Sequence, residues 1–145
     1  MRISFMQKAC LGLAMAAGVA LLPSLSVAKT YNLTVDKVMI DTGDFQKEGI
    51  GYNGKSPGPV LRFQEGEDVT INVTNNLDES TSIHWHGLIL PFQMDGVPKI
   101  SFPGIEPGET FTYKFPIVQS GTYWFHSHSG FQEPDGAYGS IVIEP

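Results

Sequence analysis

The chain has 145 residues, of which 15 are acidic and 9 are basic, and its formal net charge is −6. All 15 acidic residues but only 7 of the basic ones follow residue 28, so the formal charge of residues 29–145 is −8. This acidity excludes the basic face by which proteins bind nucleic acid. The length of residues 29–145 suits one ordinary domain.

The first 28 residues have the pattern of a secretory signal peptide. Basic residues near the N-terminus precede an apolar run over residues 11–22, and Ser26-Val27-Ala28 supplies small residues at the usual cleavage spacing. The apolar run is short for a bilayer span, which favours a removed signal over a membrane anchor. We therefore expect cleavage after Ala28 and a periplasmic protein. Cys10 leaves with the signal, so residues 29–145 contain neither a disulfide nor a thiolate metal ligand.

Residues 29–145 are expected to be all-β. Short runs of alternating or β-rich residues are separated by glycine and proline, as in a β-sandwich or barrel. The expected strands are residues 31–40, 60–63, 69–74, 83–90, 110–115, 121–128 and 138–144. Residues 91–107 are rich in proline and glycine and predict a long surface loop. We expect two packed sheets with Greek-key connections and no helix of any length after residue 28.

All four histidines of the chain fall in two His-x-His pairs, His84-Trp85-His86 and His126-Ser127-His128. Side chains at i and i+2 project from the same face of a strand, so each pair offers two imidazoles side by side. Imidazole is the commonest protein ligand for copper and zinc. An isolated histidine is more often an ordinary surface or core residue. Two pairs that use every histidine available predict a metal site.

Aromatic residues surround both histidine pairs. The expected role of each is core packing, although together they could also exclude water from a metal. They are Trp85, Tyr123, Trp124 and Phe125.

Three motifs carry a resemblance to a known family. They are Thr-Ser-Ile-His-Trp-His-Gly at residues 81–87, Met-Asp-Gly-Val-Pro at 94–98 and Gly-Thr-Tyr-Trp-Phe-His-Ser-His at 121–128. In this order they resemble the first cupredoxin, or plastocyanin-like, domain of a multicopper oxidase, and most closely that of the periplasmic copper-resistance protein A branch. The resemblance extends over residues 29–145. It implies a cupredoxin-like Greek-key β-sandwich with copper as the cofactor.

The resemblance also implies a role for each residue that matches a motif. His84 is similar to a ligand of the type 2 copper, and His86, His126 and His128 are similar to ligands of the type 3 copper pair. Asp95 resembles a carboxylate that hydrogen-bonds water at the cluster and relays protons during oxygen reduction. The alternative for Asp95 is an ordinary loop aspartate before glycine, a position that turns favour.

The chain departs from the family in what residues 29–145 lack. A full multicopper oxidase has further domains with a second set of His-x-His ligands and a His-Cys-His segment, whose cysteine binds type 1 copper. Residues 29–145 have no cysteine, and four histidines are too few for a trinuclear cluster. We therefore expect copper binding without independent catalysis.

Three hypotheses remain open from the sequence. The chain could be a truncated or split copper-binding domain of a copper-resistance oxidase, or a stand-alone periplasmic copper binder. It could also be one part of a copper-dependent oxidase, completed by another chain or by missing C-terminal domains. The first two share their biochemistry. The third requires a partner that supplies the remaining copper ligands.

Overall fold

The computed structural model describes residues 29–145, so the predicted signal peptide over residues 1–28 lies outside the described residues. The elements are β1 (Lys29–Asp41), β2 (Gln46–Tyr52), β3 (Leu61–Gln64), β4 (Asp68–Asn75), β5 (His84–His86), the 3-10 helix η1 (Phe92–Met94), β6 (Thr110–Pro116), β7 (Gly121–His126) and β8 (Tyr138–Glu144). Among these residues, no helix is long and apolar enough to cross a membrane.

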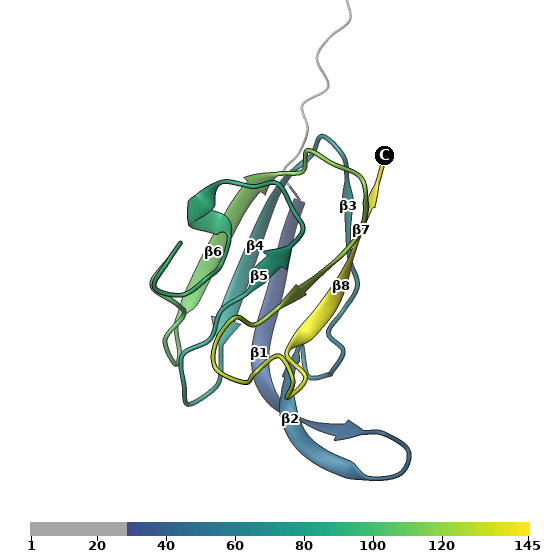
Figure 1. Cartoon of the computed structure of the whole chain (residues 1–145), viewed down its shortest axis with the longest axis vertical. Coiled ribbons are helices and arrows are strands. Elements are labelled where there is room, and N and C mark those ends of the chain that lie inside the picture. The colour runs from purple at the N-terminus through teal and green to yellow at the C-terminus, as the bar shows by residue number, and fades with distance from the viewer. Residues whose placement is uncertain (1–28) are drawn as a thin grey trace, which may run out of the picture.

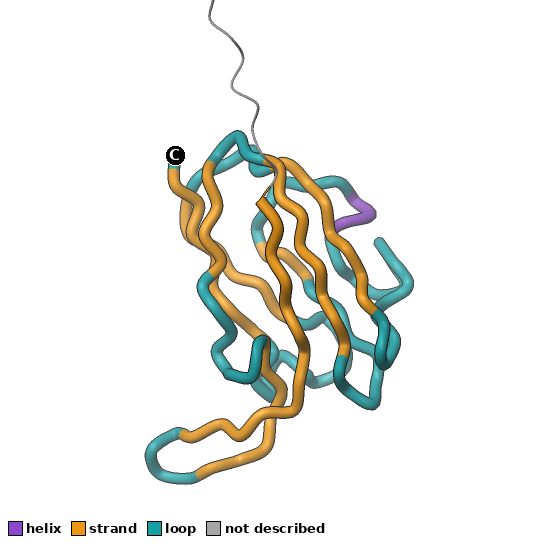
Figure 2. Tube along the Cα trace, turned by 180° about the vertical axis from the view of Figure 1, so that it is seen from behind, coloured by secondary structure: helices purple, strands orange, loops and turns teal. Residues whose placement is uncertain are grey.

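The strands form two four-stranded sheets packed face to face, as Figure 1 shows. One sheet has the order β2-β1-β4-β6 and the other the order β3-β8-β7-β5. Two neighbouring pairs, β1 with β4 and β3 with β8, run parallel, and the other neighbours are antiparallel. The chain therefore crosses repeatedly between the sheets, and the predicted all-β sandwich is confirmed. The β1–β2 hairpin extends beyond the sandwich at one end (Figure 2).

The core lies between the two sheets and is built by alternation along the strands. In β4, Val69, Ile71 and Val73 are buried, whereas the residues between them are half-buried. The indole of Trp85 lies at the centre, with the Tyr113 ring 5.2 Å away in an edge-to-face arrangement. Such aromatic pairs stabilise a core beyond the area that they bury. Because Trp85 points inward, the residues on either side of it point outward.

The structure differs from the expected elements in four places. Strand β7 ends at His126, two residues short of the predicted 121–128, so His128 lies outside the strand. Strand β2 was not expected, because its sequence contains two glycines and no period-two alternation. Strand β5 is shorter than the predicted residues 83–90, since Gly87 adopts a φ of +85° and turns the chain. The loop over residues 91–107 contains η1, and its Phe102 and Ile105 are buried. This loop is therefore not simply a surface segment.

Candidate metal centre

The two histidine pairs meet because β5 and β7 are neighbours in the second sheet (Figure 1). The antiparallel register pairs His84 with His126, Trp85 with Phe125 and His86 with Trp124. Directly opposite residues of an antiparallel pair project from the same face. Trp85 and Phe125 therefore enter the core, and three histidines gather on the outer face. The sequence-based prediction that the residues flanking Trp85 share a face is confirmed.

The imidazole rings lie close enough to share a metal. The ring centroid of His84 lies 5.5 Å from that of His86, 5.4 Å from that of His126 and 5.7 Å from that of His128. One ring nitrogen each of His84, His86 and His126 lies within 4.8 Å of the others. Nitrogens that bind one metal at about 2 Å lie up to about 4 Å apart, so small side-chain movements suffice. His128 adjoins this group of three but is not part of it.

The orientation of the His84 ring is fixed by the loop that follows η1. Its Nδ1 lies 2.7 Å from the backbone carbonyl oxygen of Asp95, and 3.5 Å from a carboxylate oxygen of the same residue. A carbonyl only accepts, so Nδ1 carries the proton and donates, which leaves the lone pair on Nε2 for a metal. The predicted site residue Asp95 therefore does lie against a histidine, and its backbone makes the closer contact.

His126 is held in a similar way, but it is buried. Its Nδ1 donates to the Ser127 carbonyl oxygen at 2.9 Å, and its Nε2 lies 3.3 Å from Nδ1 of His86. Burial lowers the pKa of His126, because the imidazolium form loses hydration there, while the Ser127 carbonyl and the Glu133 carboxylate oppose this effect. The neutral ring, which is the form that binds metals, is therefore favoured.

The two faces of the site differ in access. The indole of Trp124 stacks on the ring of His126, with centroids 4.2 Å apart, and lies 4.9 Å from the ring of His86. His86 and His128 are exposed, whereas His126 is buried. His128 contributes to the lining of two open depressions. Trp124 thus covers one side of the site, whereas the site is open to solvent at His86 and His128, the second histidine of each pair.

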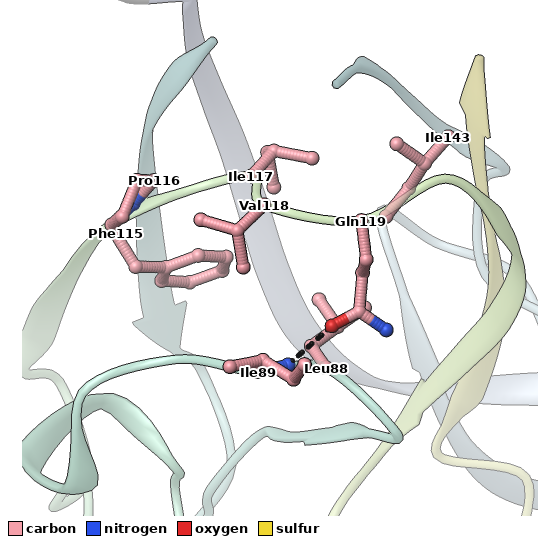
Figure 3. Close-up of a pocket in the computed structure, with 8 residues that line it drawn as sticks. All are labelled: Leu88, Ile89, Phe115, Pro116, Ile117, Val118, Gln119 and Ile143. Atoms are coloured by element: carbon pink, nitrogen blue, oxygen red, sulfur yellow. Dashed lines mark hydrogen bonds between the residues drawn. The ribbon is translucent and has the colours of Figure 1, made fainter. Parts of the chain in front are cut away.

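A glutamine fixes the segment that leaves β5. Gln119 accepts a hydrogen bond from the Ile89 backbone N–H at 2.7 Å and donates one to the Gly87 carbonyl at 2.9 Å. Figure 3 shows Gln119 beside Leu88 and Ile89 in a small apolar pocket. The backbone directly after His86 is therefore tied to the β6–β7 connection.

The sequence did not single out two contacts of the site. A carboxylate oxygen of Glu133 lies 2.9 Å from Nδ1 of His126, and Gln132 is buried beneath the second histidine pair. Nothing in residue spacing distinguishes Glu133 from the other acidic residues. The signal available was the resemblance to the copper-resistance protein A branch, which continues through Gly-Phe-Gln-Glu at residues 130–133.

Comparison with known proteins identifies the family. The family model described as multicopper oxidase matches residues 27–145. The chain belongs to the multicopper oxidase family. It is 51% identical over 114 residues to copper resistance protein A of Escherichia coli, covering 79% of this chain and 19% of that protein. It is 44% identical over 100 residues to L-ascorbate oxidase of Cucumis sativus, covering 66% of this chain and 17% of that one.

Solved structures agree with this assignment. The multicopper oxidase of Pseudomonas thermotolerans matches with a TM-score of 0.77 at 37% identity, over 82% of this chain and 30% of that one. The laccase of Botrytis aclada matches with a TM-score of 0.78 at 39% identity, over 83% and 23%. The predicted cupredoxin-like fold is confirmed. The chain spans about a fifth of the length of the curated relatives it matches.

The donor set of this multicopper oxidase domain fits the cofactor of its family. Neutral imidazoles bind copper in either oxidation state, and here three of them converge on one face of a paired strand. The domain is therefore a copper-binding domain, and the prediction of copper as cofactor is confirmed.

Proposed function

We propose that His84, His86, His126 and His128 are the copper ligands of an exported domain that does not reduce dioxygen by itself. The observation that carries this proposal is the gathering of three ligand nitrogens within 4.8 Å on the outer face of β5 and β7, with His128 next to them. The strand register brings two of these histidines together from neighbouring strands, so their ligand atoms form a rigid set. This arrangement favours a metal site over the alternative that the four histidines are unrelated surface residues.

Each residue has a separate task in this proposal. His84 and His126 present Nε2, because backbone carbonyls hold their Nδ1 protons. His86 presents Nδ1, the nitrogen that faces His126. Trp124 covers the ring of His126 and keeps water from that side. Copper, when bound, supplies the change of oxidation state on which electron transfer to dioxygen depends.

The proposed lack of independent catalysis rests on the number and type of metal-binding side chains in residues 29–145. Reducing dioxygen to water takes several electrons, so it calls for several coppers and an entry point for electrons. Residues 29–145 offer four imidazoles and no cysteine thiolate. These are too few donors for the three-copper cluster that the resemblance implies.

The alternative is that this domain is one part of a copper-dependent oxidase, completed by another chain or by further domains. The exposure of His86 and His128 supports it, because a partner could approach both rings from the open side. The relatives are also about five times longer than the matched segment. Under this alternative the partner supplies the remaining ligands.

The proposed setting is the periplasm and the proposed role is copper resistance. The signal-like pattern of residues 1–28 supports export. The 51% identity to proteins named copper resistance protein A, from Escherichia coli and Pseudomonas syringae, supports the role.

Titration of purified residues 29–145 with Cu(II) and Zn(II) tests the proposal. We expect tighter binding of Cu(II), as the order of divalent affinities for nitrogen sites implies. We also expect no intense blue colour, since no thiolate is available, and negligible oxidation of phenols or cuprous ions. Equal or tighter binding of Zn(II), or steady oxidase turnover by the pure domain, would contradict the proposal.

The substitution Asp95→Asn separates the two contacts that Asp95 makes to His84. The backbone carbonyl, at 2.7 Å, remains in the variant, whereas the carboxylate, at 3.5 Å, loses its charge. We expect the Cu(II) affinity to stay within about threefold of wild type, below the 10- to 100-fold typical of losing a supporting contact to a ligand. A competition titration measures this ratio, and a loss above about tenfold would assign the support of His84 to the carboxylate instead.

A further inference from the structure

The Gln132 side chain is a buried polar group that the copper site does not use directly. It is 3% exposed and lies in the turn after the second histidine pair. Its Oε1 lies 2.7 Å from both the Thr81 and the Ser127 hydroxyl oxygens. Its Nε2 lies 2.9 Å from the Glu79 carboxylate and 3.0 Å from the Ser80 carbonyl oxygen. All four hydrogen-bonding positions of the amide are therefore occupied.

The contacts allow only one orientation of this amide. The Glu79 carboxylate and the Ser80 carbonyl only accept hydrogen bonds, so the NH₂ group of Gln132 must face them. Oε1 must then accept from the hydroxyls of Thr81 and Ser127. A fully satisfied buried network of this kind specifies one arrangement of the segments that it joins.

The segments joined are those that carry the two histidine pairs. Residues 79–82 lead into His84, and Ser127 lies between His126 and His128. The network continues from the Ser127 hydroxyl, which accepts from the Ser129 backbone N–H at 3.1 Å.

His128 depends on this network because it lies beyond the end of β7, where no ladder hydrogen bond holds it. Its backbone N–H donates instead to the Ser82 hydroxyl at 2.9 Å. That hydroxyl lies 2.9 Å from the Ser129 hydroxyl, which links it back toward Ser127. Gln132 therefore reaches His128 indirectly: it bonds the Ser127 hydroxyl, which holds the Ser129 backbone, and Ser129 in turn contacts the Ser82 hydroxyl that accepts from His128.

We propose that Gln132 is a positioning residue of the copper site, which holds His128 at its place beside the other three histidines by tying the chain after β7 to the segment before β5. This inference rests on the proposed function only in taking His128 as a ligand. Gln132 itself touches no metal ligand atom and acts through the backbone of residues 127–129.

A double-mutant cycle between Gln132→Ala and His128→Ala, with Cu(II) as the probe, tests the proposal in residues 29–145. In the wild-type background, Gln132→Ala weakens Cu(II) binding about tenfold, as loss of a supporting contact to a metal ligand does. In the His128→Ala background the same substitution costs less than about twofold, because the residue through which it acts is already gone. A tenfold loss in both backgrounds, or in neither, would overturn the proposal.

Two controls separate positioning from general stability. Val73→Ala removes buried side-chain volume from β4, in the other sheet, and lowers the melting temperature without touching the network. The Cu(II) affinity of Val73→Ala stays within about twofold of wild type when it is measured well below the melting temperature. A tenfold loss of affinity in Val73→Ala would mean that destabilisation alone accounts for the weaker binding of Gln132→Ala. Gln64→Ala removes an exposed amide that hydrogen-bonds the C-terminal backbone, and leaves binding unchanged.

Hydrogen exchange supplies a readout that needs no copper. In Gln132→Ala, the His128 amide exchanges about tenfold or more faster than in Val73→Ala, since the Ser127–Ser129 segment that carries it is no longer tied to the segment before β5. If wild type binds no copper, the proposed function fails and this measurement alone decides the positioning of His128. An unchanged exchange rate would overturn the inference even where copper binds.

Should Gln132→Ala fail to fold, Ser127→Ala, which removes one contact to the same amide, takes its place in the cycle.

Discussion

Replacing His84 and His126 together by alanine lowers the affinity of the domain for Cu(II) by at least about 100-fold, beyond the effect of losing a supporting contact alone. The two residues lie directly opposite each other on β5 and β7 and supply two of the three clustered nitrogens. Backbone carbonyls hold the rings of the half-buried His84 and the buried His126 in place. We therefore expect no neighbouring side chain to take over as copper ligand when both histidines are removed.

The measurement is a competition titration of residues 29–145 against a chelator of known Cu(II) affinity. The matched control is Asn32→Ala with Asn72→Ala, which also removes two polar side chains in contact across neighbouring strands, here β1 and β4. The control should bind copper as wild type does. Unchanged affinity in the histidine variant would remove the metal assignment and leave only the fold and the family.

Substituting Gly96 by alanine destabilises the domain strongly. An alanine Cβ at this position would lie 1.7 Å from the backbone carbonyl oxygen of Ile83, and the φ of +80° is itself unfavourable for a side chain. We expect the free energy of unfolding to fall by at least about 3 kcal/mol, because the backbone next to His84 has to move. The same movement displaces the Asp95 carbonyl, so copper binding weakens in the fraction that remains folded.

Gly108→Ala is the matched control for this substitution. Its φ is +78°, but no atom lies within 4 Å of the added Cβ. It therefore reports backbone strain alone, which costs about 1–2 kcal/mol. Urea denaturation followed by tryptophan fluorescence measures both variants. Equal losses would mean that Gly96 is required only for its backbone conformation and not for its close approach to Ile83.

Residue spacing predicted that the histidines of the first pair share a face, because this grouping depends on strand periodicity. The i, i+2 spacing of His84 and His86 places both on the face opposite Trp85, and burial of that indole makes the choice of face unambiguous. The second pair follows the rule only in part, because β7 ends at His126 and His128 lies beyond it. That β5 and β7 are neighbours was not available from periodicity. It came from the resemblance of three motifs to a known family.

The contacts that support the site could not be predicted in this way. Glu133 and Gln132 approach the histidines through a turn whose path depends on tertiary packing, and Asp95 acts chiefly through its backbone carbonyl, which every residue has. Strand β2 was missed for a related reason. Its two glycines pack against backbone at Asp135 and Lys55, so close approach and not hydrophobic alternation determines its sequence.

The loop over residues 91–107 shows that proline and glycine content predicts irregular backbone but not whether the segment is buried. Proline and glycine correctly indicated the absence of long regular elements, but Ile105 exchanges backbone hydrogen bonds with Thr81 and is buried. This contact ties the loop to the segment that enters β5. The loop thus helps to hold the first histidine pair, a role that its turn-rich sequence does not indicate.

The copper site can be located directly by anomalous diffraction at the copper absorption edge from crystals of residues 29–145 soaked in Cu(II). We expect the strongest anomalous peak on the outer face of β5 and β7, about 2 Å from ring nitrogens of at least three of the histidines His84, His86, His126 and His128. Peaks confined to carboxylates elsewhere, with the four imidazoles free, would contradict this expectation.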